Sequence, residues 1–165
     1  MSNPPEQPLL EALLDSWDRN NTILTNLLDL VPVQGLGVRT TASSPSIAEL
    51  FTHIHYARLA LVQEDAPEFA KPMPEKEWVE DRNRDHIAQL LNQSALAVRQ
   101  AVESKIQTGQ QMDLHYDHPI LLLQHMIWHE GYHHGQIKLA LKAAGMPIAN
   151  KQAGPLTWRI WMNKK

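Results

Sequence analysis

The chain contains no cysteine among its 165 residues. This absence excludes disulfide frameworks, cysteine-ligated zinc, iron–sulfur clusters and a thiol nucleophile supplied by the protein itself. An excess of positive charge is missing as well, because 15 Lys and Arg stand against 18 Asp and Glu. The resulting net charge of −3 does not favour nucleic acid or an anionic membrane surface as a partner.

Long hydrophobic runs are also missing. No apolar stretch approaches the roughly 18 residues that a membrane-spanning helix needs. Residues 1–7 are polar and lack the basic start and apolar core of a secretory signal, so we expect a cytoplasmic protein. The length indicates one domain, which we expect at residues 9–165 after a flexible N-terminus at residues 1–8.

Strand-like alternation is almost absent, whereas apolar residues recur at helical spacing. Ser46 and Glu49 form a capping box before an apolar run, and Gly109 follows a third periodic stretch. The apolar stripe of the first stretch is interrupted at Asn20 and Asn21. Helices are predicted from about Leu10 to Val31, from Ser46 to Gln63, through Ile87–Ile106, and from Asp117 or Pro119 to Gly145.

Four long helices with workable connections predict an all-α fold, a four-helix bundle. The segment after the fourth helix carries Trp158 and Trp161. We expect it to form a short C-terminal helix whose indoles pack back onto the bundle. The Met and Trp residues in general are interpreted as core.

Histidine is abundant instead, with nine residues in the chain. Each helical residue turns by about 100° from the one before, which places His129 at about 80° and His133 at about 120° on the fourth helix. Both positions fall within that helix's apolar stripe, which centres near 90° on the same projection. His134 falls on the polar side.

Two imidazoles four residues apart on an apolar face require partners, because burying an unpaired polar group costs free energy. A divalent metal would satisfy both rings at about 2.0–2.1 Å. The alternative is a pair of core histidines bonded to each other, to water or to a carboxylate. Gln136 lies one turn further on the same face.

A third ligand has to come from another helix, because no Asp or Glu follows His133. The second helix offers His53 and His55, whose directions differ by about 160°. His53 flanks the inward stripe and is slightly favoured. Two ligands from one helix and one from another leave coordination positions open, which is typical of a catalytic site.

The run from His129 to His133 also fits H-E-x-x-H, the helix of zinc peptidases, in which the glutamate is the general base. That class usually takes a third ligand from downstream, and here only the adjacent His134 follows. The longer H-E-x-x-H-x-x-G-x-x-H form fails, because Gln136 and Leu139 stand in the Gly and His places. A metallopeptidase is therefore disfavoured.

The stretch from His129 to Ile137 resembles the fourth-helix motif of the DinB-like superfamily, His-Glu/Asp-x-x-His-x-Gly-Gln. The stretch from Ser46 to Ile54 is similar to the second-helix motif of that family, whose histidine is the first ligand. The tail from Gly145 to Trp161 resembles the family's C-terminal end. One departure is His134, where the family often carries Arg.

The resemblance implies a four-helix bundle, often a homodimer, with a divalent metal, usually zinc or nickel, held by three histidines. Mapped onto this chain, it implies His53, His129 and His133 as ligands. Some relatives are thiol-dependent transferases or isomerases that use low-molecular-weight thiols.

Two further side chains of the fourth helix are candidates for the chemistry. Glu130 is a candidate base or outer-sphere group, with a solvated helix-edge carboxylate as the alternative. Gln136 is a candidate to bond a ligand or the substrate, with the capping of a buried polar group as the alternative. Gly131 and Gly135 form a small-residue notch that would admit a neighbouring helix in a dimer, with local packing accommodations as the alternative.

Two classes of function stay open at this point. The first is a metal-dependent enzyme, of the thiol-dependent transferase or hydrolase type, acting on a small molecule. The second is a non-catalytic bundle that serves as a binding or structural protein.

Overall fold

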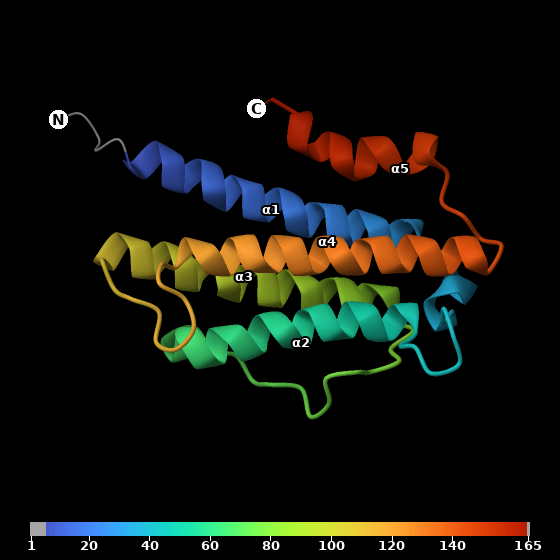
Figure 1. The fold of residues 1–165 in the computed structure, drawn as a ribbon, viewed down its shortest axis with the longest axis horizontal. Coiled ribbons are helices and arrows are strands. Elements are labelled where there is room, and N and C mark those ends of the chain that lie inside the picture. Colours follow the sequence, from blue (N-terminus) through green and yellow to red (C-terminus); the bar gives the residue numbers. More distant parts are fainter. Residues whose placement is uncertain (1–5, 165) are drawn as a thin grey trace.

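The computed structural model describes residues 6–164, and all helices and turns below lie in that range. Four long helices lie side by side, and a shorter one packs along the first (Figure 1). The α-helices are α1 (Glu6–Leu30), α2 (Ile47–Asp65), α3 (Arg84–Thr108), α4 (Ile120–Ala143) and α5 (Asn150–Leu156). Short 3₁₀ helices are η1 (Val33–Gly37), η2 (Pro67–Phe69) and η3 (Trp158–Met162). The described part contains no β-strand, which confirms the predicted all-α bundle.

The helix ends follow the local signals in the sequence. The Ser46 side chain accepts a hydrogen bond from the Glu49 amide, and the Glu49 carboxylate accepts one from the Ser46 amide. This capping box satisfies amides that the first turn of α2 cannot bond internally. Gly109 ends α3 with a φ of 65°, a left-handed conformation that favours glycine. The capping box thus fixes the residue at which α2 begins, and with it the position of the α2 histidines along the bundle axis.

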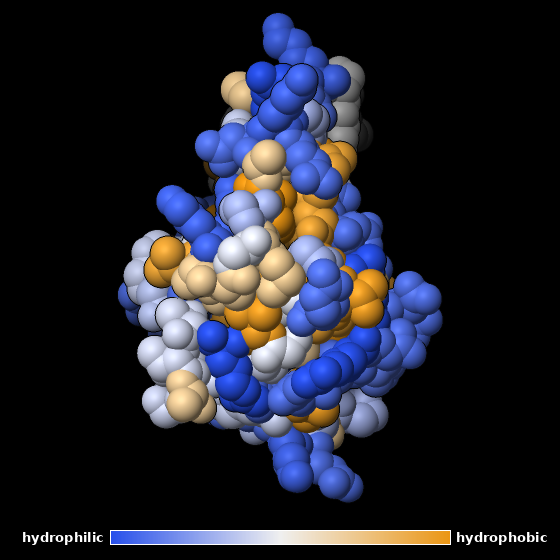
Figure 2. Space-filling model, turned by 90° about the vertical axis from the view of Figure 1, so that its right-hand side faces the viewer, coloured by the Kyte–Doolittle hydropathy of each residue, from blue (hydrophilic) through white to orange (hydrophobic). Residues whose placement is uncertain are grey.

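Two apolar clusters fill the bundle. One contains Leu24 of α1, Ile54 of α2 and Ile137 of α4, and the other contains Trp17, Leu59 and Met126 of the same helices. The first is closed at the end of the bundle by η1 and the segment after α4, where apolar residues lie inside a hydrophilic rim (Figure 2). Between the two clusters lie buried polar side chains, among them Asn20 of α1, Arg58 of α2 and Glu130 of α4.

The connection between α2 and α3, residues 66–83, runs back along α2 (Figure 1). Thr52 of α2 fastens it, because the Thr52 hydroxyl lies 3.0 Å from both the amide and the carbonyl oxygen of Val79. An exposed ion pair of 2.9 Å between Arg39 and Glu80 adds a second attachment. The connection is therefore held against α2 rather than extended into solvent.

The C-terminal segment packs on α1, where Arg19 donates to backbone carbonyls of Ile160 and Asn163. Its tryptophans lie in η3 and not in an α-helix, and both Trp158 and Trp161 stay more than 40% exposed. The general expectation of core tryptophans was also wrong for Trp128, which is 72% exposed, whereas Trp17 is fully buried. Trp128 is exposed because its side chain projects from α4 away from the other helices.

At the N-terminus, α1 begins at Glu6, so residues 6–8 of the expected flexible segment are helical. The rest of that segment, residues 1–5, lies outside the described residues. Within the described range, no helix combines the length and apolarity needed to cross a bilayer.

Candidate metal centre

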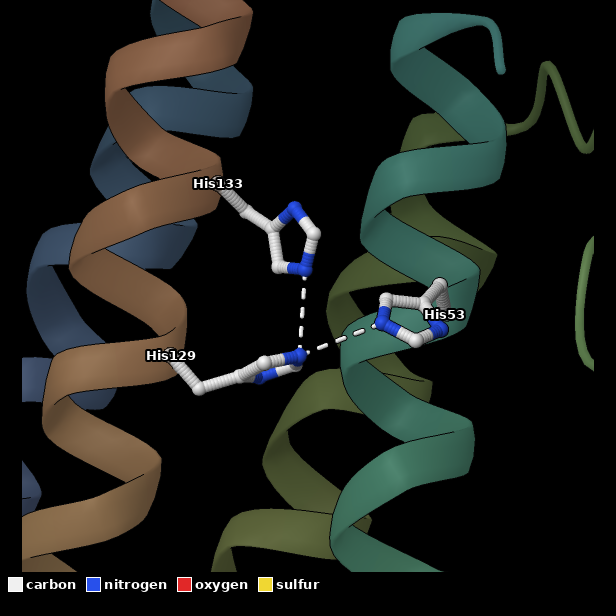
Figure 3. A group of neighbouring side chains, drawn as sticks. All are labelled: His53, His129 and His133. Atoms are coloured by element: carbon white, nitrogen blue, oxygen red, sulfur yellow. Dashed lines mark hydrogen bonds between the residues drawn. The ribbon is translucent and has the colours of Figure 1, made fainter. Parts of the chain in front are cut away.

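Three histidine side chains meet between α2 and α4, and their rings point toward one another (Figure 3). The Nε2 atom of His129 lies 3.1 Å from Nε2 of His53 and 3.0 Å from Nε2 of His133. All three rings present one nitrogen to the same small volume, within 4.8 Å of one another. The structure thus brings together the three residues predicted as ligands.

The placement follows from helical geometry and the start of α2. His129 and His133 are four residues apart, so they lie on one side of α4. His53 lies in the second turn of α2, opposite them. His55 turns to α3 instead, where its Nδ1 lies 2.8 Å from the carbonyl oxygen of Leu90. The sequence left His53 and His55 nearly equal as candidates, and the structure places His53, not His55, in the cluster with His129 and His133.

The two nitrogen separations from His129 match those of metal ligands. Ligand nitrogens at about 2.0–2.1 Å from a metal, with angles between about 90° and 110°, lie about 2.9–3.4 Å apart. The contacts that His129 makes fall inside that range. A purely hydrogen-bonded cluster fits less well, because one ring nitrogen directs a single proton or a single lone pair, and Nε2 of His129 has two partners. The donor set therefore suits a cation that accepts three lone pairs.

The three imidazoles are held in the neutral form that metal ligation requires. Burial is the main cause, and it lowers the pKa of His129 to about 4, with smaller contributions from His133 and His53. Burial also lowers the pKa of His133 and of His53, although Glu77 opposes the shift at His53. At neutral pH the cluster carries lone pairs and little charge.

Gln136 lies where the sequence placed it, next to the cluster. Its Oε1 accepts a hydrogen bond from Nδ1 of His133 at 2.7 Å, and its Nε2 donates to the hydroxyl of Tyr132 at 3.0 Å. A proton held on Nδ1 leaves the Nε2 lone pair of His133 directed at the centre. Gln136 therefore selects the tautomer that can bind a metal.

Two residues of the connection between α2 and α3 belong to the site and were missed by the sequence analysis. Oε1 of Glu77 lies 2.8 Å from Nδ1 of His53, and the Trp78 indole stacks on the His53 ring. A carboxylate this close to a ligating histidine raises the basicity of the ring through its charge. The proline-rich sequence around them carries no periodicity, so no local signal pointed to either.

Glu130 was expected as a base or as a solvated carboxylate, and the structure buries it at 1% exposure. Its two oxygens accept hydrogen bonds from Arg58 at 2.6 and 2.8 Å, and one also accepts from Asn20. The solvated alternative was therefore wrong. A base role for Glu130 stays a prediction that requires one oxygen to leave this network.

Shallow grooves adjoin the centre on the surface. One of about 370 Å³ is lined by Gln136, Leu139 and the hydroxyl-bearing residues Thr40, Ser43 and Ser44. A neighbouring groove shares Ser43 and Ser44 and reaches Trp78. The His53 side chain is 14% exposed. A small molecule lying in these grooves would therefore touch the residues that surround the cluster.

Comparison with known proteins gives one match. The family model described as DinB family matches residues 1–155. Neither the curated proteins nor the solved structures contain a significant match to this chain.

Proposed function

This chain belongs to the DinB family, and from that premise we propose that it binds one divalent cation, zinc or nickel, through His53, His129 and His133. We propose further that it uses this site for a reaction on a small molecule. The observation that carries the proposal is the convergence of three histidine nitrogens within 4.8 Å of one another, with Nε2 of His129 at metal-ligand spacing from the other two. Three protein ligands leave positions open for water or substrate, as in catalytic rather than structural sites.

A cation at this centre would supply Lewis acidity, lowering the pKa of a water or thiol that reaches it. The chain's own residues prepare that chemistry by holding neutral imidazoles in fixed orientations. Gln136 keeps the proton of His133 on Nδ1, and the Glu77 carboxylate stands behind His53. These contacts support a centre that is organised before substrate arrives.

The reaction class we favour is thiol-dependent transfer or hydrolysis. The chain contains no cysteine, so a thiol has to arrive as a low-molecular-weight co-substrate. The groove beside Gln136 offers hydroxyls and an apolar wall at Leu139, a surface suited to a small polar molecule. The engagement of both Glu130 oxygens by Arg58 disfavours the peptidase alternative, in which the glutamate has to face water at the metal.

Metal analysis of protein purified without a histidine tag tests the binding step. One equivalent of zinc or nickel, lost in His129→Ala, supports the proposal. Absence of stoichiometric metal in the wild-type protein, with no change in His129→Ala, supports the non-catalytic binding or structural alternative. Conjugation assays with low-molecular-weight thiols then separate a transferase from a hydrolase.

The homodimer expected from the resemblance is also a proposal, and the outer side of α4 is the surface we favour for it. A Cβ added at Gly131 or Gly135 would meet nothing within 4 Å. The exposed rings of Trp128 and Tyr132 stack beside the two glycines with centroids 6.5 Å apart. Light scattering of the purified protein measures the mass of the particle in solution, which distinguishes a dimer from a monomer.

A further inference from the structure

One buried ion pair connects the two helices that carry the histidines. Arg58 of α2 and Glu130 of α4 are paired through two parallel hydrogen bonds, and both side chains are 0% exposed. Glu130 directly follows His129, and Arg58 lies five residues after His53. The pair therefore lies within about one and a half turns of the ligands on each helix.

The pair also reaches the other two long helices. The Arg58 guanidinium donates to the Asn21 side chain of α1 at 2.9 Å and to the Leu91 carbonyl of α3 at 2.8 Å. It lies 4.8 Å from the centre of the Trp17 ring, and Asn20 donates to Glu130. All four long helices thus meet through directional bonds in the polar layer between the two apolar clusters.

Such a pair is a poor way to gain stability. Removing two charges from water carries a large desolvation penalty, and replacing a buried pair by apolar residues of similar volume is often neutral or stabilising. Directional bonds, however, favour one relative placement of the helices they join, whereas apolar packing tolerates small slips. The benefit of this pair is therefore expected in geometry rather than in free energy of unfolding.

We propose that the Arg58–Glu130 pair positions the metal centre by fixing α2 and α4 against each other, so that His53 meets His129 and His133. The inference rests on the proposed function, since it concerns cation binding. Both residues are positioning residues in this role, because they contact the ligand-bearing helices and not the cation.

The test replaces the pair by apolar side chains in the double variant Arg58→Met/Glu130→Leu, which leaves no uncompensated charge. Zn²⁺ affinity is measured by competition with a chelator, and the visible spectrum with Co²⁺ reports coordination geometry. Urea unfolding of the metal-free proteins identifies conditions under which both are fully folded. We expect the metal-free double variant to be about as stable as wild type but to bind Zn²⁺ at least about tenfold more weakly, with a changed Co²⁺ spectrum.

A matched control removes another ion pair, that of Lys105 with Asp113 at the end of α3, in the variant Lys105→Met/Asp113→Asn. Its Zn²⁺ affinity and Co²⁺ spectrum should equal those of the wild type. If the apolar double variant does not fold, the variant Arg58→Lys is tested in its place, because lysine keeps the positive charge but cannot form the bidentate hydrogen bond. We expect several-fold weaker Zn²⁺ binding in that variant.

The outcomes separate the two proposals. Wild-type affinity and an unchanged Co²⁺ spectrum in the folded double variant, or in Arg58→Lys, would overturn the positioning role alone. Failure of the wild-type protein to bind Zn²⁺, Co²⁺ or Ni²⁺ would overturn the proposed metal site and the positioning role with it.

Discussion

The His53 imidazole lies flat against the Trp78 indole, with ring centroids 4.1 Å apart and an angle of 4° between the planes. The two residues come from different segments, since His53 belongs to α2 and Trp78 to the connection that follows it. The stack restricts rotation of a ring whose Nε2 faces the cluster. The connection between α2 and α3 therefore contributes to the site through a contact that involves no ligand atom.

Replacement of Trp78 by alanine should weaken metal binding without removing it. Such a stack contributes about 0.5–1.5 kcal/mol, so Trp78→Ala should reduce Zn²⁺ affinity about two- to tenfold. Trp128→Ala is the matched control, because that indole is exposed on the outer side of α4. Isothermal titration of metal-free protein measures both. Equal affinity in the wild type and Trp78→Ala would show that the stack does not restrain His53.

Removal of the carboxylate behind His53 should have a larger effect. Glu77→Gln should lower Zn²⁺ affinity about 10- to 100-fold, the usual consequence of losing an outer-sphere partner of a ligating histidine. Glu75→Gln changes an exposed carboxylate of the same connection and should leave the affinity unchanged. Chelator competition provides the measurement. Similar losses in the two variants would point to a general charge effect instead of the contact with Nδ1.

Loss of a ligand should abolish stoichiometric metal binding. His129 contacts both other histidines, so His129→Ala removes the central member of the cluster. His134→Ala, five residues on along the same helix, should retain one equivalent of metal. Elemental analysis after gel filtration distinguishes them. Retention of a full equivalent by His129→Ala would contradict the assignment of the ligands.

The lowered pKa of Asp65 predicts how the free energy of unfolding depends on pH. Burial raises the pKa of this carboxyl, but hydrogen bonds from the His115 amide and ring and from the Leu114 amide outweigh burial and lower it overall. A folded-state pKa below the unfolded value of about 3.9 stabilises the fold above that value, and the contribution is lost as pH falls through the folded pKa.

The variant Asp65→Asn should therefore lose about 2 kcal/mol of unfolding free energy at pH 7, the order expected for hydrogen bonds to a buried charge. The difference from wild type should shrink as pH falls below about 4, where the wild-type carboxylate becomes protonated. Urea unfolding across this range measures it. A difference that does not depend on pH would mean that the carboxylate charge is not what stabilises the contact.

Two glycines with opposite surroundings provide a test of the packing. A Cβ at Gly154 would lie 2.9 Å from the Trp158 ring, so Gly154→Ala should lower the unfolding free energy by about 1–3 kcal/mol. Within a single copy of the chain a Cβ at Gly131 meets open space, so in a monomer Gly131→Ala should raise the unfolding free energy by about 1 kcal/mol through helix propensity. In the dimer proposed above, the added methyl group should weaken association. If Gly131→Ala instead destabilises the protein and lowers its mass in light scattering, the notch is occupied by a second copy.

Much of the candidate site could be read from the sequence, because its information is local. The four-residue spacing fixes that His129 and His133 share a side of α4, and the apolar stripe shows that this side faces inward. The capping box fixes where α2 begins. The ligand pair, Gln136 and the four long helices all follow from periodicity within one helix, and the structure places each of them accordingly.

The rest depended on contacts between distant segments. Periodicity gives a direction around one helix axis but not which helix lies there, so His53 and His55 were hard to rank. For the same reason the sequence named no partner for Glu130. Asn20, which interrupts the apolar stripe of α1, donates a hydrogen bond to Glu130 in the structure.

The sequence by itself determined the helices, the absence of protein thiols and the histidine pair, because these follow from composition and from a period of 3.6 residues. The tertiary structure decided the third histidine, the contacts of Glu77 and Trp78 with it, and the burial of Glu130 against Arg58. Those features arise when segments far apart in the chain pack together, and no single helix encodes the distance or rotation of its neighbours.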